Sequence, residues 1–133
     1  MNRIMAFNIL IVDDSKTIRS VIKKTLQIAE VPIGQLYEAS NGEEGLALMK
    51  DQWVDLVFAD INMPVMTGIE MIEHMVHDDL LSKTPVVIIS TEGSKTRIEE
   101  LFKMGVRAYI RKPITPEILR TVIKDVMGDY DAQ

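Results

Sequence analysis

Short apolar runs rich in β-branched residues alternate along the chain with longer stretches in which apolar residues recur every three or four positions. A run of the first kind indicates a strand buried on both faces, and a stretch of the second kind indicates an amphipathic helix. The alternation predicts five strands, at residues 8–12, 36–39, 55–59, 86–90 and 108–111, each followed by a helix. This order is typical of a parallel sheet covered by helices on both faces, so the predicted fold class is α/β.

Capping residues mark several predicted helix ends. Ser15 can cap the first helix, and Thr115-Pro116 pairs a capping hydroxyl with a proline at the first helical position. Thr67-Gly68 opens the third helix, Gly105 closes the fourth, and Gly45 is mildly unfavourable inside the second. The first helix is expected to place its apolar residues Ile18, Val21, Ile22 and Leu26 on one stripe, and the third helix carries Ile69, Ile72, Met75 and Val76.

Size and composition fit a single domain. The chain has 133 residues, of which 47% are hydrophobic, enough for one core spanning about residues 7–128. We find no linker, and we expect no appended effector domain. A net charge of −5 argues against binding nucleic acid through its phosphates, and the lack of cysteine excludes disulfides and is compatible with a reducing cytosol. No apolar run approaches the roughly 18 residues of a membrane span, so we expect a cytoplasmic protein without membrane contact.

Polar residues at the carboxyl ends of the predicted strands carry the candidate chemistry. In open parallel α/β sheets these ends face one crevice, so five side chains far apart in the sequence should meet there: Asp13, Asp14, Asp60, Ser90 and Lys112. Three carboxylates in a small space repel one another and favour a hard cation such as Mg²⁺, which prefers oxygen ligands. A lysine and a hydroxyl beside them suit phosphoryl oxygens. The set predicts a phosphoryl-transfer site with Asp60 as nucleophile and Asp13 and Asp14 at the metal.

The motifs that carry this chemistry resemble those of the response regulator receiver family. They are the acidic pair after the first strand, Asp60-Ile61-Asn62-Met63-Pro64 with Gly68, Ser90 after the fourth strand, and Tyr109-Ile110-Arg111-Lys112-Pro113. The resemblance covers about residues 7–128 and implies a doubly wound, flavodoxin-like (βα)5 fold with strand order 2-1-3-4-5. It implies that Asp60 accepts phosphate from a phosphohistidine, and that Ser90 and Lys112 contact the phosphoryl group. It further implies Mg²⁺ held by Asp14, Asp60 and the backbone carbonyl of Asn62, with Asp13 reached through water.

The resemblance also implies a switch. On phosphorylation Ser90 moves towards the phosphate, Tyr109 turns inward, and the surface of the fourth helix, fifth strand and fifth helix reports the change. The Lys112-Pro113 bond is cis in the family. Asn62 and Glu92 are similar to the pairing in chemotaxis regulators, which implies a short-lived phosphoryl group. Thr91 departs from the small residue usual at its position, so a larger side chain there is expected to restrict access to the phosphate.

The resulting expectation is a monomeric, stand-alone response regulator, a signalling domain rather than an enzyme acting on other substrates, with a plausible role in chemotaxis. Its partners would be a histidine kinase or histidine phosphotransfer domain, docked on the first helix at Lys16 and Arg19, and a target protein. Basic residues crowd the C-terminal third and could form a basic edge for an acidic target or be ordinary solvated side chains. One alternative is a phosphorelay shuttle that returns phosphate to another histidine. The other, a haloacid-dehalogenase-like phosphatase, requires an Asp-x-Asp motif that the adjacent Asp13-Asp14 does not provide.

Overall fold

Five parallel strands form one sheet in a computed structural model that describes residues 6–91 and 93–128. The strands are β1 (Phe7–Val12), β2 (Ile33–Ala39), β3 (Leu56–Ala59), β4 (Val86–Ser90) and β5 (Ala108–Arg111), in the order β2-β1-β3-β4-β5. The helices are α1 (Lys16–Ile28), α2 (Gly42–Asp51), α3 (Gly68–Val76), α4 (Lys95–Lys103) and α5 (Pro116–Met127), with a short 3-10 helix η1 (Leu81–Lys83). The predicted α/β class and strand order are therefore confirmed.

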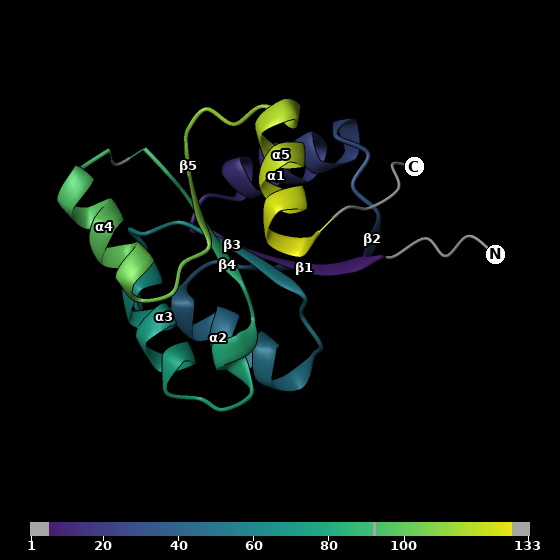
Figure 1. Cartoon of the computed structure of the whole chain (residues 1–133). Helices are drawn as coiled ribbons and strands as arrows, with labels where there is room; N and C mark the ends of the chain where they lie inside the picture. The colour runs from purple at the N-terminus through teal and green to yellow at the C-terminus, as the bar shows by residue number, and fades with distance from the viewer. Residues whose placement is uncertain (1–5, 92, 129–133) are drawn as a thin grey trace.

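The helices cover the sheet on both faces (Figure 1). On one face, α1 and α5 pack on the sheet through Ile22, Leu26, Leu119 and Ile123. On the other face, α2, α3 and α4 contribute Leu46, Met71, Ile72 and Leu101 to a second cluster. Burying apolar side chains on both faces explains why β3 and β4 are buried along their whole length, as the continuous apolar runs predict. No helix in residues 6–91 and 93–128 has the length and apolarity needed to cross a bilayer.

Side-chain caps begin the helices where the sequence indicates. Ser15 accepts a hydrogen bond from the backbone of Ile18, and Thr115 does the same for Ile118, with Pro116 next to it. Thr67 and Glu70 form a complete capping box at the start of α3. Each cap satisfies backbone N–H donors that the first turn of the helix leaves unpaired, and this fixes the residue at which the helix begins.

Some sequence expectations about these elements are wrong. Val21 is exposed by 47%, so it lies outside the buried stripe of α1. Strand β2 begins at Ile33, three residues earlier than expected, because its first residues pair with β1 at the sheet edge although Gly34 and Gln35 are exposed. The 3-10 helix η1 was not predicted.

Candidate functional site

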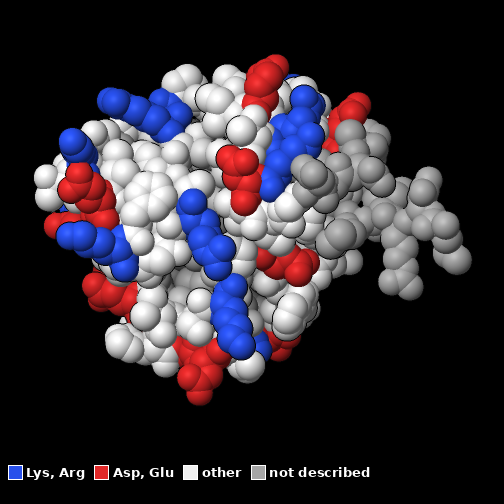
Figure 2. Space-filling model, viewed as in Figure 1, with Lys and Arg blue, Asp and Glu red and all other residues white. Residues whose placement is uncertain are grey.

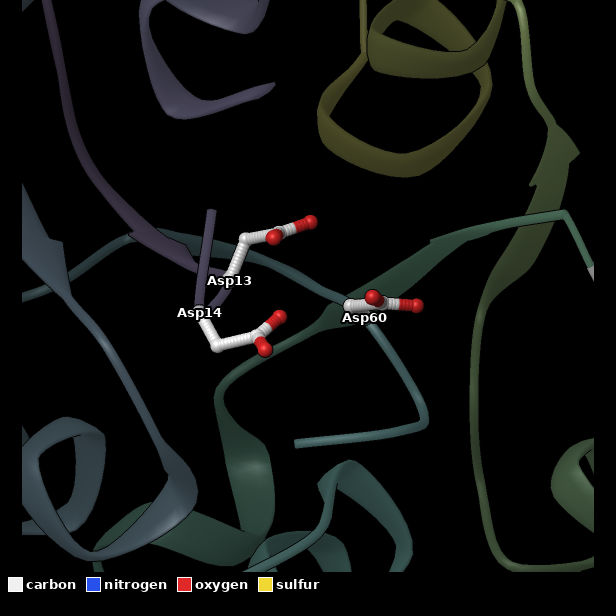
Figure 3. Close-up of side chains that lie close together, drawn as sticks. All are labelled: Asp13, Asp14 and Asp60. Carbon is white, nitrogen blue, oxygen red and sulfur yellow. The ribbon is translucent and has the colours of Figure 1, made fainter. Parts of the chain in front are cut away.

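Two neighbouring strands end level with each other and deliver three carboxylates to one place. Val12 of β1 pairs with Ala59 of β3, and the backbone N–H of Asp60 donates to the carbonyl of Val12 at 2.9 Å. Asp13 and Asp14 follow β1 directly, and Asp60 follows β3 (Figure 3). One carboxylate oxygen from each of the three lies within 4.8 Å of the others. The predicted convergence of these residues is confirmed.

Asp13 is the most firmly held of the three. It is 2% exposed, and its Oδ1 accepts the backbone N–H of Ser15 at 2.9 Å, which links it to the cap of α1. The guanidinium of Arg19 donates to the backbone carbonyl of Asp13 and, through Nε, to Glu38 at 3.0 Å. Arg19 was expected on an exposed docking face, but its side chain is only 14% exposed and is turned towards this loop. Its place four residues after the Ser15 cap is the one sequence signal that could have indicated this role.

Lys112 brings the positive charge to the cluster. Its Nζ lies 3.2 Å from Oδ2 of Asp13 and 3.6 Å from Oδ2 of Asp60. Its backbone N–H donates to the carbonyl of Ser90 at 2.9 Å, so the ends of β4 and β5 are joined beside the carboxylates. The Lys112-Pro113 peptide bond is cis, as the resemblance implies. The lysine thus lies between two of the three carboxylates and partly balances their charge.

The carboxyl group of Asp60 has a raised pKa. Burial is the main cause, because it removes water from the charged form, and the charge of Asp13 acts in the same direction. The Lys112 ammonium, the Ile61 backbone N–H at 2.8 Å from Oδ1, and a hydrogen bond with the Ser90 side chain lower the pKa and offset part of the effect. Ionised Asp60 is therefore in an environment that favours any additional positive charge.

The loop after Asp60 depends on a glycine. A Cβ at Gly68 would lie 2.1 Å from the carbonyl oxygen of Asp60, far inside contact distance, so the first turn of α3 rests directly on the peptide of Asp60. The Gly68 N–H also donates to the carbonyl of Ile61 at 2.9 Å. Within the same loop Val65 has φ +67° and is 74% exposed. Such a left-handed conformation is strained for a β-branched residue.

The expected switch residues lie on the neighbouring strands. Ser90 ends β4 with 1% exposure, close enough to Asp60 for its side chain to hydrogen bond with that carboxyl group. Tyr109 pairs with Ile88 across β4 and β5 and is partly buried against the core cluster that includes Met71 and Leu101. Asn62 and Thr91 are exposed near the opening of the site, and Glu92 lies outside the described residues. The structure therefore brings together Asp13, Asp14, Asp60, Ser90 and Lys112, with Asn62 following Asp60 by two positions.

The donor set fits a hard divalent cation. Among the residues that the structure describes, the cluster that could ligate a metal offers carboxylate oxygens and includes no nitrogen or sulfur ligand. Mg²⁺ prefers such oxygen ligands and commonly uses only one or two carboxylates, with water and phosphate oxygens filling its shell. Because Asp14 is exposed while Asp13 is buried, a cation would have access from the Asp14 side.

Comparisons with known proteins agree with this geometry. Residues 9–124 match the family model of the response regulator receiver domain. The chain is 36% identical over 121 residues to a chemotaxis protein CheY homolog of Campylobacter jejuni, covering 90% of this chain and 92% of the relative. It is similar to the crystal structure of the chemotaxis protein CheY4 of Vibrio cholerae, with a TM-score of 0.81, 32% identity, and coverage of 92% and 99%. A CheX-CheY complex with BeF3 and Mg²⁺ from Borrelia burgdorferi gives a TM-score of 0.79 at 28% identity, with coverage of 91% and 89%.

Proposed function

This chain belongs to the response regulator receiver domain family, and we propose that it is a phosphorylation switch whose acceptor is Asp60. The observation that carries the proposal is the arrangement around that carboxylate. Lys112 lies 3.6 Å from Asp60, and one carboxylate oxygen each of Asp13, Asp14 and Asp60 lies within 4.8 Å of the others. A carboxylate beside both a fixed ammonium and a potential cation site is suited to attack a phosphoryl group, because both neighbours compensate charge on the transferred oxygens.

The reaction would be an in-line transfer. A carboxylate oxygen of Asp60 forms a bond to phosphorus while the bond from phosphorus to the donor's imidazole nitrogen breaks, and the imidazole takes up a proton. Lys112 pairs with one phosphoryl oxygen, and the hydroxyl of Ser90 donates to another. Attack of water on phosphorus later returns the carboxylate and releases inorganic phosphate. Positioning and charge compensation account for most of the rate, because the side chains undergo no other covalent chemistry.

We assign the metal to the acidic cluster. Asp14, Asp60 and the backbone carbonyl of Asn62 would hold Mg²⁺, and Asp13 would act through water, as the family resemblance implies. The ion would supply positive charge to the phosphoryl oxygens. Arg19 supports this set indirectly, because its hydrogen bond to the Asp13 carbonyl holds the loop that carries both acidic residues.

Phosphorylation of Asp60 would change the surface that the protein presents to a target. Ser90 moving towards the phosphate and Tyr109 repacking inward would alter the face formed by α4, β5 and α5. Figure 2 shows Lys and Arg side chains along the middle of this face, which supports the interpretation that a target protein presents acidic groups there. The two states must lie within a few kcal/mol of each other for one phosphoryl group to shift the population.

We place the protein in cytoplasmic chemotaxis signalling, between a histidine kinase or phosphotransfer domain and a target protein. The named relatives are chemotaxis proteins, and the Borrelia burgdorferi structure shows a CheY bound to CheX. Lys16 is exposed at the start of α1 and remains available to a kinase, whereas Arg19 is engaged with Asp13 and Glu38. Asn62, Thr91 and Glu92 are proposed to set the lifetime of the phosphoryl group.

One experiment tests the assignment of the acceptor. The protein is treated with Mg²⁺ and acetyl phosphate, and any phosphoryl group is located by mass spectrometry of proteolytic fragments. A single acid-stable, base-labile phosphate on Asp60 is expected, absent from Asp60→Asn and present in Asp79→Asn, which removes an exposed aspartate elsewhere. Phosphate on another residue, or none in the presence of Mg²⁺, would refute the proposal.

A further inference from the structure

An open pocket of about 640 Å³ lies at the end of the sheet opposite to Asp60. It is bounded by the turn that leads into β3 and by the segment around η1 that leads into β4. Strand β3 has four residues and is buried throughout, so it separates the pocket from Asp60 by about 13 Å. Nothing in the proposed phosphoryl chemistry uses this end of the sheet.

The two most exposed large apolar side chains of residues 6–91 and 93–128 line this pocket. Leu80 is 84% exposed and Trp53 is 76% exposed. Isolated exposed apolar residues are ordinary, but two that share one concave site form a surface that a partner can cover. Tryptophan in particular contributes strongly to protein interfaces, since it offers a large contact area with few rotatable bonds.

Hydrogen bonds hold both residues in their exposed positions. The indole N–H of Trp53 donates to Oδ1 of Asp55 at 2.9 Å, and Oδ2 of Asp55 accepts the backbone N–H of Asn8 at 2.8 Å. The backbone N–H of Leu80 donates to Oδ1 of Asp78 at 2.9 Å. The apolar groups are therefore presented by a hydrogen-bonded frame tied to the sheet, which reduces the conformational entropy lost on binding.

The charges around the pocket select the kind of partner. Four aspartates and two lysines line it: Asp51, Asp55, Asp78, Asp79, Lys50 and Lys83. Asp51 and Asp79 are exposed, one on the side of Trp53 and the other next to Leu80. An exposed indole beside carboxylates is suited to a guanidinium or ammonium group, which is attracted to the ring face and to the acidic oxygens together. An acidic peptide would meet repulsion instead.

We propose that this pocket docks a cationic and apolar peptide segment of a partner protein, independently of phosphorylation. An arginine or lysine of the segment lies against Trp53 and the carboxylate of Asp51. An aliphatic side chain packs beside Leu80, with further positive charge near Asp79. Such a site would let a partner hold the protein while the opposite end of the sheet exchanges phosphate.

Trp53 provides the readout, because it is the single tryptophan of the sequence. The probe is a capped synthetic peptide in which arginines alternate with leucines, compared with two peptides of equal length, one with glutamates in place of arginines and one with serines in place of leucines. The arginine–leucine peptide is expected to change the Trp53 emission saturably and to shift backbone amide resonances of residues 50–55 and 78–84. Each comparison peptide should bind at least about tenfold more weakly.

Substitutions in and away from the pocket test which side chains bind the peptide. Asp51→Asn combined with Asp79→Asn, and separately Leu80→Ser, should each weaken binding about tenfold while leaving acetyl phosphate labelling of the protein unchanged. Asp125→Asn, a charge change of the same kind on α5, should have no effect on binding, and Asp60→Asn should bind like wild type. Equal binding of the glutamate peptide, resonance shifts centred on α4, β5 and α5, or loss of binding in Asp60→Asn would overturn the proposal. The protein could instead self-associate in sedimentation experiments, and Leu80→Ser could abolish that association. This result would show that a second copy of the chain occupies the pocket, and it would also overturn the proposal.

Discussion

Replacing Asp60 by asparagine should stabilise the protein in metal-free buffer at neutral pH. The charge of Asp60 is attracted by Lys112 at 3.6 Å and repelled by Asp13 and Asp14 within 4.8 Å. With an effective dielectric constant of about 20, the attraction is about 4.6 kcal/mol and the repulsion from Asp13 at least about 3.5 kcal/mol, the value at the 4.8 Å limit, while exposed Asp14 adds about 1 kcal/mol in water-like surroundings. These contributions nearly cancel, so the burial of the ionised carboxylate decides the sign.

The expected gain is about 1–2 kcal/mol. Removing a charge from water costs several kcal/mol, and the hydrogen bonds from the Ile61 N–H and Ser90 return part of it. Asparagine keeps an oxygen acceptor of the same size without the charge. For a domain of this length the gain corresponds to an increase in Tm of about 4–8 °C in a chelator. Asp79→Asn makes the same charge change on an exposed loop and should shift the Tm much less.

The pH dependence gives a second check on the same reasoning. The pKa of Asp60 is raised in the folded protein, so its protonated form stabilises the fold at low pH and that stabilisation is lost as pH rises through the raised pKa. The difference in Tm between wild type and Asp60→Asn should therefore be largest at neutral pH and shrink as pH falls towards the ordinary pKa of aspartate. Mg²⁺ should raise the Tm of wild type and leave that of the variant almost unchanged. A variant that melts at or below the wild-type temperature in chelator would refute this account of the cluster.

Three further substitutions test the surroundings of the site. Val65→Asn should raise the free energy of unfolding by about 1 kcal/mol in urea titrations, because asparagine tolerates φ +67° better than a β-branched residue; an unchanged midpoint would show that the loop is not strained. Gly68→Ala should lower the free energy of unfolding by more than about 2 kcal/mol, because the new Cβ would collide with the Asp60 carbonyl. A variant with wild-type stability in circular dichroism melts would contradict that contact. Arg19→Met should weaken Mg²⁺ binding about tenfold in calorimetry while the secondary structure is retained, because the Asp13 carbonyl loses its donor; wild-type affinity would show that Arg19 has no positioning role.

The site could be predicted from the sequence because its residues follow strands. Parallel strands bring their carboxyl ends to one edge, so the polar residues after Val12 and Ala59 had to approach Ser90, the last residue of β4, once the strand order was known. The family resemblance supplied that order, and local hydrophobic patterns could not. The contact of Arg19 with Asp13 was missed because a helical arginine is ordinarily solvated, and the pattern of α1 does not show that Glu38 stands opposite it.

Tertiary packing explains the positions at which the local sequence preference differs from the observed structure. Gly45 is unfavourable in an isolated helix, but a Cβ there would lie 3.1 Å from both Met71 and Val12, so glycine lets α2 approach β1 and α3 closely. Val65 could not be predicted either, because the backbone preferences of β-branched residues disfavour the positive φ that it adopts. The early start of β2 follows from pairing with β1 at the sheet edge, which overrides the weak strand preference of Gly34.

The contact between Gly68 and the carbonyl oxygen of Asp60 limits how this protein can evolve. Every missense change in the Gly68 codon introduces a side-chain carbon, and each would push the helix away from the peptide of Asp60. Descendants of this gene can therefore vary exposed positions of the preceding loop, such as Val65, far more freely than Gly68. Selection should therefore remove substitutions of Gly68 even where Asp60 itself is unchanged.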